Sequence, residues 1–185
     1  MSGLLTESKA KFVFKIVIIG DPAVGKTSLI KKYTQGNFKE DYIQTIGAQL
    51  SNYKEEINGD TCTLFFWDIA GHDPFYFLRP AFYEGSRAGI IVFSLEESKH
   101  GKKSFEHIDE WHDDIKEHCG NLPIILFGNK VDLVDEKTLN EKKIWKLVKK
   151  RDFIGYYRTS AKTGQGVVQS FRVLIKELHN KYRKL

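Results

Sequence analysis

The sequence predicts an α/β fold: a three-layer sandwich in which a six-stranded, mostly parallel sheet with one antiparallel edge strand lies between helices on both faces. Short β-branched apolar runs alternate with longer amphipathic stretches, which is the pattern of parallel βαβ units. Asn58-Gly59 separates two such runs and predicts a hairpin, because both residues tolerate positive φ. Ligands of such sheets bind at the carboxyl ends of the strands, so the functional site is expected in the loops there.

The elements follow from the same patterns. Strands are predicted at residues 13–19, 48–57, 61–67, 89–94, 123–127 and 154–159, and helices at 25–33, 103–118, 138–151 and from 167 onward. The polar stretch 36–47 is predicted to be a loop. Thr138 and Glu141 have the spacing of a capping box and predict where the third helix begins. The last helix carries predicted core residues at helical spacing, namely Val167, Phe171, Leu174 and Leu178.

Length and composition indicate one domain. The chain has 185 residues, enough to bury a core without disulfides or structural metal. We expect an N-terminal extension at 1–11, a globular domain at 12–180 and a short basic tail at 181–185. Cys62 and Cys119 make no disulfide framework, no apolar run is long enough to cross a bilayer, and no secretory signal is visible. A cytoplasmic monomer is expected.

The net charge of +5 arises largely from basic runs near 142–151 and 176–184. Such a run could contact a nucleic acid or an anionic membrane surface. A solvated, lysine-rich helix face is the preferred interpretation, because acidic residues are interleaved and no basic motif interleaved with aromatic residues is present. We therefore expect no nucleic-acid partner and at most a peripheral membrane contact.

The strongest motif follows the first predicted strand. Residues 20–27 read Gly-Asp-Pro-Ala-Val-Gly-Lys-Thr and match the phosphate-binding pattern G-x-x-x-x-G-K-[ST], between a strand and a helix as that motif requires. Backbone N–H groups of such a loop surround phosphate oxygens, and Gly25 lets the backbone approach them. Lys26 is expected to reach the β- and γ-phosphates, and the Thr27 hydroxyl to ligate Mg²⁺. The predicted nucleotide contacts here are Asp21, Ala23, Val24, Gly25, Lys26, Thr27 and Ser28.

Further predicted contacts to the metal and the terminal phosphate come from two other segments. Asp68 closes the third predicted strand and is a candidate Mg²⁺ ligand, directly or through water. Thr45, in the polar loop, is the remaining candidate ligand. The backbone N–H of Gly71 is placed to meet a γ-phosphate. The motif thus indicates a P-loop nucleoside triphosphatase with magnesium as cofactor.

Two segments predict that the base is guanine. Asn129-Lys130-Val131-Asp132 follows the fifth strand, and the Asp132 carboxylate can accept from the ring N–H and the exocyclic amine of guanine. Adenine lacks that ring N–H and would leave the carboxylate partly unpaired. Lys130 is expected to lie over the base and Asn129 to connect neighbouring loops. Ser160-Ala161-Lys162 follows the sixth strand, where a backbone N–H could meet guanine O6.

In order and spacing, these segments resemble the guanine-nucleotide boxes of Ras-superfamily GTPases, over residues 12–180. Gly20-Asp21, Thr45-Ile46-Gly47 and Phe82-Tyr83-Glu84-Gly85 are most similar to the Rab branch. The resemblance implies GTP and GDP as substrate and product, and switch I and switch II near 36–47 and 71–83. It also implies that Phe38 packs beside the nucleotide. Effectors would bind the switches, and an exchange factor and an activating protein would act in trans.

The chain departs from that family in three places. His72 stands where the family has the glutamine that orients the attacking water, and Pro22 replaces a small residue of the phosphate loop. The last residues contain no cysteine, hence no prenylation signal as they stand. We expect slow hydrolysis with Lys26 and His72 as catalytic residues. A GTP-binding module that hydrolyses negligibly stays open as an alternative, whereas a P-loop ATPase or kinase is disfavoured by the two guanine segments.

Overall fold

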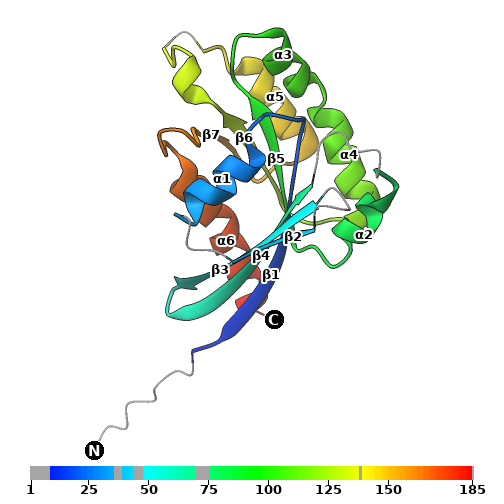
Figure 1. Cartoon of the computed structure of the whole chain (residues 1–185), viewed down its shortest axis with the longest axis vertical. Coiled ribbons are helices and arrows are strands. Elements are labelled where there is room, and N and C mark those ends of the chain that lie inside the picture. The colour runs from blue at the N-terminus through cyan, green and yellow to red at the C-terminus, as the bar shows by residue number, and fades with distance from the viewer. Residues whose placement is uncertain (1–8, 36–38, 44–47, 70–75, 138, 185) are drawn as a thin grey trace, which may run out of the picture.

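A seven-stranded sheet runs through the middle of the computed structural model, which describes residues 9–35, 39–43, 48–69, 76–137 and 139–184 (Figure 1). Its order is β2-β3-β4-β1-β5-β6-β7. The strands are β1 (Lys11–Ile19), β2 (Lys39–Ile43), β3 (Ala48–Ile57), β4 (Asp60–Ile69), β5 (Ala88–Ser94), β6 (Ile124–Asn129) and β7 (Tyr156–Arg158). Within the described residues, only β3 runs opposite to the other strands, since it pairs antiparallel with both β2 and β4.

Helices cover both faces of this sheet (Figure 1). α1 (Lys26–Tyr33) and α6 (Val167–Arg183) pack on one face, while α2 (Arg79–Tyr83), α4 (Ile108–Cys119) and α5 (Lys142–Arg151) pack on the other. α3 (Lys99–Glu106) lies against β5. The α/β sandwich predicted from the sequence is therefore confirmed, but the sheet has seven strands rather than six, and the antiparallel strand β3 lies between β2 and β4 rather than at the edge. Among the described helices, none is both long and apolar enough to cross a membrane.

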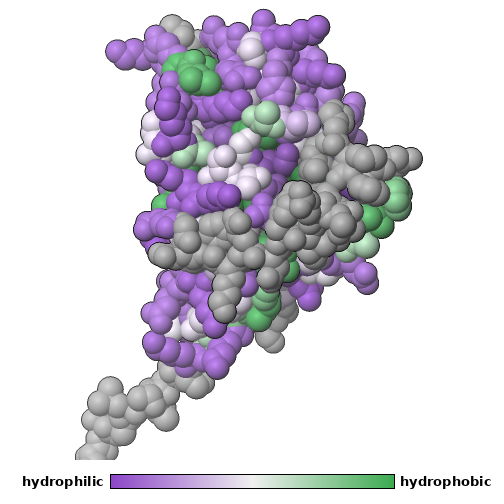
Figure 2. Space-filling view, viewed as in Figure 1, coloured by the Kyte–Doolittle hydropathy of each residue, from purple (hydrophilic) through white to green (hydrophobic). Residues whose placement is uncertain are grey.

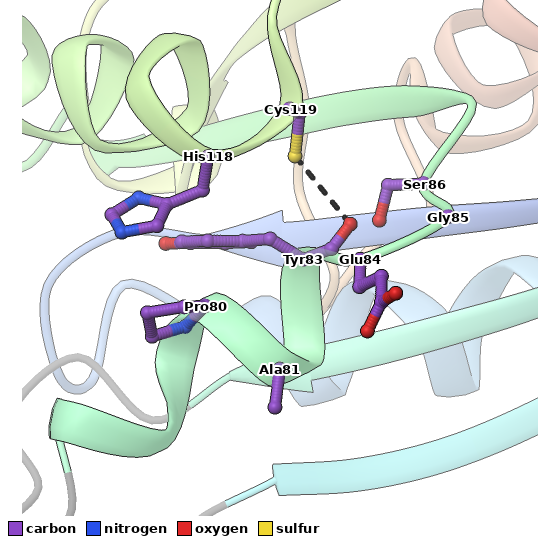
Figure 3. Close-up of a pocket in the computed structure, with 8 residues that line it drawn as sticks. All are labelled: Pro80, Ala81, Tyr83, Glu84, Gly85, Ser86, His118 and Cys119. Atoms are coloured by element: carbon purple, nitrogen blue, oxygen red, sulfur yellow. Dashed lines mark hydrogen bonds between the residues drawn. The ribbon is translucent and has the colours of Figure 1, made fainter.

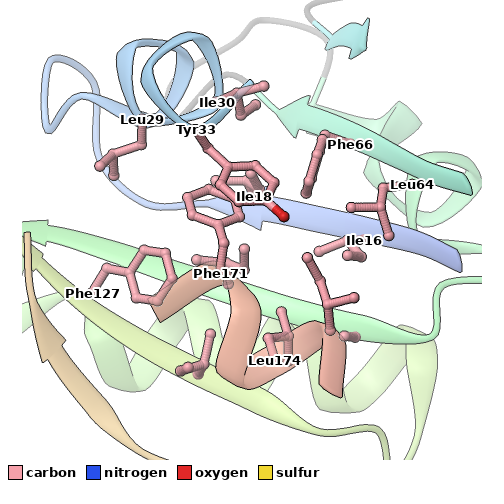
Figure 4. Packing of buried hydrophobic residues seen from close by; sticks show 14 of the residues in the cluster. Ile16, Ile18, Leu29, Ile30, Tyr33, Leu64, Phe66, Phe127, Phe171 and Leu174 are labelled. Carbon is pink, nitrogen blue, oxygen red and sulfur yellow. The ribbon is translucent and has the colours of Figure 1, made fainter. Parts of the chain in front are cut away.

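The core between the sheet and α6 contains a cluster of aromatic rings around Phe171 (Figure 4). Tyr33 and Phe171 stack with ring centres 4.4 Å apart, and the rings of Phe66 and Phe127 meet Phe171 at 88° and 64°. Phe171, Leu174 and Leu178 are fully buried, and Val167 is 1% exposed. Burying each side chain of this size contributes about 1.5–3 kcal/mol. The predicted core face of the last helix is confirmed.

All six predicted strands are present, and the predicted hairpin turn is confirmed by φ values of 52° at Asn58 and 86° at Gly59. The prediction of a loop over 36–47 is wrong for residues 39–43, which form β2 and pair with β3. Residues 36–38 and 44–47 lie outside the described part of the chain. β2 was missed because its sequence, Lys-Glu-Asp-Tyr-Ile, is mostly charged. Charged residues are common on edge strands, where one side of the backbone faces water.

Two helix boundaries differ from the predictions. The helix predicted at 103–118 begins at Lys99, where the Ser98 hydroxyl accepts from the backbone N–H of Gly101 at 3.0 Å, and it is interrupted at His107. Glycine disfavours a helix interior, but at position 101 the Cβ of any other residue would lie 2.1 Å from the carbonyl oxygen of Glu96. The glycine is thus required by close packing. The five-residue α2 was not predicted.

The capping-box prediction for the third helix is also wrong, because α5 begins at Lys142 and Glu141 caps it without a side-chain bond. Instead, the Asn140 side chain accepts from the Lys142 N–H at 3.2 Å. Thr138 lies outside the described residues. The predicted boundary between domain and tail at 180–181 falls inside α6, which continues to Arg183.

The end of α6 is fastened to the hairpin by a buried carboxylate. Asp60 accepts from the Ala10 N–H at 2.9 Å, from Arg183 at 2.5 Å and from Nε2 of His179 at 2.8 Å. His179 is only 1% exposed. These bonds, that to His179 above all, hold the pKa of Asp60 below its ordinary value.

We therefore expect Asp60→Asn to lower the free energy of unfolding at pH 7, and the difference from wild type to shrink in acid. A carboxylate with a depressed pKa stabilises the fold above its unfolded pKa of about 3.9, and the stabilisation is lost as pH falls below that value. Urea unfolding between pH 7 and pH 2.5 measures this, with Glu117→Gln at an exposed site on α4 as control. A difference that stays constant with pH would contradict the assignment.

Candidate nucleotide-binding site

The phosphate loop joins β1 to α1 at the carboxyl edge of the sheet. Gly20 has φ 140°, and a Cβ there would lie 2.1 Å from the carbonyl oxygen of Val92 in β5. Gly25 has φ 101°, and Ala23 also adopts a positive φ of 59°. Alternation of right- and left-handed residues turns successive backbone N–H groups to the same side, which produces a concave anion site. The required loop geometry is therefore present.

Lys26 is buried in this loop, with 7% of its surface exposed. Its ammonium donates to the carbonyl oxygens of Gly20 at 2.9 Å and Asp21 at 3.0 Å. Burial lowers the pKa of Lys26, while Asp68 and Asp21 oppose that shift. The position is poorly hydrated, so an anion that reaches the ammonium is attracted more strongly than it would be in water.

Thr27 and Asp68 form the candidate magnesium site. The Thr27 hydroxyl donates to Oδ2 of Asp68, which brings a hydroxyl and a carboxylate oxygen together next to Lys26. Burial raises the pKa of Asp68, against the bond from Thr27 and the charges of Lys26 and Lys31. A buried carboxylate beside a hydroxyl suits Mg²⁺, which takes few protein oxygens and completes its shell with water and phosphate. In the part of the chain that the structure describes, no cluster of three or more His, Cys, Asp or Glu side chains competes for a metal.

Asn129 connects the phosphate loop to the loop after β7. Its amide nitrogen donates to the carbonyl oxygen of Val24 at 2.7 Å, and its amide oxygen accepts from the Thr159 hydroxyl and the Ala161 N–H, both at 3.2 Å. Asn129 is 1% exposed. A Cβ on Gly25 would lie 2.3 Å from this amide nitrogen, so glycine is required there on both conformational and steric grounds. The linking role predicted for Asn129 is confirmed.

The two segments predicted to bind the base also meet. The Ser160 hydroxyl donates to Oδ1 of Asp132 at 2.6 Å and accepts from the Thr163 N–H at 3.1 Å. Lys130 adopts a left-handed conformation with φ 66°, and its ammonium donates to Glu96 at 3.0 Å. That bond holds the pKa of Glu96 below its ordinary value. Asp132 and Lys162 are exposed and Ala161 is half-buried, so this loop pair faces solvent.

Not every predicted residue is placed. Phe38, Thr45, Gly71 and His72 lie outside the described residues. Ser28 is exposed on α1. The side chain of Asp21 has partners that the sequence did not reveal: His107 and Trp111 bind its carboxylate. These partners stand 86 and 90 residues away, and no local spacing signals such a contact.

A hollow of about 540 Å³ between α2 and the end of α4 is a separate feature (Figure 3). The Cys119 thiol lies there, 3.5 Å from the carbonyl oxygen of Tyr83 to which it donates. Burial raises the pKa of Cys119, so its reactive thiolate form is disfavoured. The hollow shares no lining residue with the phosphate loop, and it does not belong to the nucleotide site.

The fold and the loop between β1 and α1 together define a P-loop protein. The chain belongs to the Ras family, whose family model matches residues 15–180. It is 36% identical to the Ypt/Rab-type GTPase ypt7 of Schizosaccharomyces pombe, covering 91% of this chain and 83% of the relative. It is 31% identical to Ras-related protein Rab-7a of Dictyostelium discoideum, covering 90% and 83%, and 32% identical to Ras-related protein Rab7 of Drosophila melanogaster, covering 91% and 81%. The predicted class, a Rab-like small GTPase of the Ras superfamily, is confirmed.

Proposed function

We propose that this chain is a magnesium-dependent guanine-nucleotide switch that binds GTP and GDP and hydrolyses GTP slowly, in membrane traffic or signalling. The contacts of Asn129 carry the proposal, because one buried amide bonds to the phosphate loop and to the loop that meets Asp132. These contacts support a single site in which the phosphates and the base bind together. The nucleotide released by denaturing the purified protein, identified by chromatography, tests it; an adenine nucleotide would overturn it.

Within this proposal the chain's own groups have separate tasks. Lys26 and the loop N–H groups bind phosphate oxygens and stabilise the charge that develops on them during hydrolysis. Thr27 and Asp68, with Thr45, hold Mg²⁺, which supplies further charge neutralisation when it is bound. Asp132 selects guanine, and Ser160 orients Asp132 through their hydrogen bond. Effectors would bind the two switch segments, and an exchange factor and an activating protein would regulate the nucleotide state.

The magnesium assignment predicts a selective loss in Thr27→Asn. The substitution replaces a ligating hydroxyl with a bulkier amide, so affinity for GTP should fall about tenfold and affinity for GDP less. Calorimetry with and without a chelator measures both. Chelation should lower the affinity of the wild type for GTP to the level of the variant and leave the variant nearly unchanged. An affinity for GTP that does not depend on magnesium would contradict the assignment.

The hydrolysis step predicts a pH-dependent role for His72. A neutral imidazole can accept from the attacking water, whereas a protonated ring cannot, and the reference pKa is about 6.5. Single-turnover hydrolysis should therefore rise with pH, with an apparent pKa within about two units of that value. His72→Ala should slow the reaction about tenfold or more, and His72→Gln should keep turnover but remove the pH dependence.

A wild-type rate that is independent of pH from about 5.5 to 8.5 and is unchanged in His72→Ala would refute the catalytic role of His72. The absence of phosphate release over hours, with GTP still bound, would instead favour a GTP-binding module that hydrolyses negligibly. Two residues motivate this second candidate, namely His72 and Pro22, the latter exposed in the phosphate loop.

A further inference from the structure

The carboxylate of Asp21, in the phosphate loop, is held by α4. Asp21 is 3% exposed. Nδ1 of His107 lies 2.8 and 3.0 Å from its two oxygens, and Nε1 of Trp111 donates to Oδ1 at 2.9 Å. The backbone N–H of Trp111 donates to the backbone carbonyl oxygen of His107, so the two side chains stand one helical turn apart. Hydrogen bonds to a carboxylate are among the stronger ones, so this contact restrains the loop.

The same face of α4 also holds α2, the helix that follows residues 70–75. The guanidinium carbon of Arg79 lies 4.7 Å from the centre of the Trp111 ring. Arg79 and Asp114 are 3.6 Å apart, and the Tyr83 hydroxyl donates to Asp114 at 2.6 Å. Trp111, 7% exposed, therefore contacts the phosphate loop with its N–H and Arg79 of α2 with its ring face.

We propose that Trp111 couples the position of α2 to the geometry of the phosphate loop, with Arg79 and His107 as further positioning residues. A displacement of α2 removes Arg79 from the indole face, frees the ring to reorient and weakens its bond to Asp21. The loop N–H groups then lose a restraint on the geometry that binds phosphate. Coupling of this kind is reciprocal, so bound nucleotide resists displacement of α2 by the same factor. This inference rests on the nucleotide binding proposed above.

The test is the dissociation rate of GDP carrying a fluorescent label, chased with excess unlabelled GDP. Asp21→Asn and Trp111→Phe should each release it about tenfold faster, and Arg79→Gln about threefold faster, since a charge-assisted bond is worth more than a cation–π contact at a partly exposed site. His107→Gln keeps a donor and should restore most of the retention that His107→Leu loses. Arg87→Gln is the matched control, because Arg87 lies over Tyr182, 5.5 Å from its ring centre, and should have no effect.

A double-mutant cycle separates coupling from independent structural roles. Arg79→Gln and Asp21→Asn together should accelerate release by less than the product of the single effects, because both act through Trp111. The coupling would be overturned if the double variant accelerated release by the full product of the two single effects. It would also be overturned if the single variants released GDP like the wild type. A wild type that does not retain GDP would instead overturn the proposed nucleotide binding, so the two failures are distinguishable.

Discussion

Lys26→Ala is expected to lose about 100-fold or more in affinity for both GDP and GTP. The ammonium is buried among loop carbonyl oxygens, where in the proposed site it would meet the charge of the phosphates. Hydrogen bonds to charged groups contribute about 1.5–3 kcal/mol, and each factor of ten corresponds to about 1.4 kcal/mol. Because the site is poorly hydrated, the lost attraction should lie at the upper end of that range. Calorimetry with each nucleotide measures the loss.

The fold should not suffer from the same substitution. Burial lowers the pKa of Lys26, which means that the fold gives this charge less solvation than water does. Removing it should leave the free energy of unfolding without nucleotide unchanged or slightly higher. Lys32→Ala, at an exposed position on α1, is the control and should bind both nucleotides like the wild type. A Lys26→Ala protein that binds GDP normally would exclude the phosphate role.

The features that the sequence predicted well are those encoded locally. The phosphate loop depends on glycines at positive φ and on a lysine at fixed spacing, and each requirement is visible in consecutive residues. The Asn58-Gly59 turn is of the same kind. The buried face of α6 could also be predicted, because apolar residues such as Phe171 and Leu174 recur along it at helical spacing.

The features that were missed depend on contacts distant in sequence. Asp21 meets His107 and Trp111 only because β1 and β5 are neighbours, which brings the loop after β1 beside the helices that follow β5. Asp60 meets His179 across 119 residues for a similar reason. β2 is an edge strand whose pairing with β3, not its own propensity, sets its conformation. Contacts between residues so far apart leave no pattern in consecutive residues, so they could not be predicted from the sequence alone.

Asp132→Asn is expected to shift the base preference from guanine to xanthine. In the proposed site the Asp132 carboxylate would pair with two donors of guanine, the ring N–H and the exocyclic amine, while xanthine carries a carbonyl oxygen in place of the amine. An asparagine amide offers one acceptor and one donor, which matches xanthine and mismatches guanine. Two bonds at about 1.5–3 kcal/mol each correspond to a loss in GDP affinity of roughly 10²- to 10⁴-fold. Competition between labelled GDP and xanthosine diphosphate measures the preference.

Asp132→Asn should change base recognition without disturbing the loops around it. The Ser160 hydroxyl donates to Oδ1 of Asp132 at 2.6 Å, and an amide oxygen at that position can accept the same bond, so the loop after β7 should keep its conformation. The link through Asn129 does not involve Asp132 and should also persist. Asp135→Asn, on the exposed loop three residues further on, removes a similar charge and should retain full preference for guanine. If Asp132→Asn also retains that preference, the base is recognised by other groups. In that case the role assigned to Asp132 is wrong, even though the phosphate loop still binds a nucleotide.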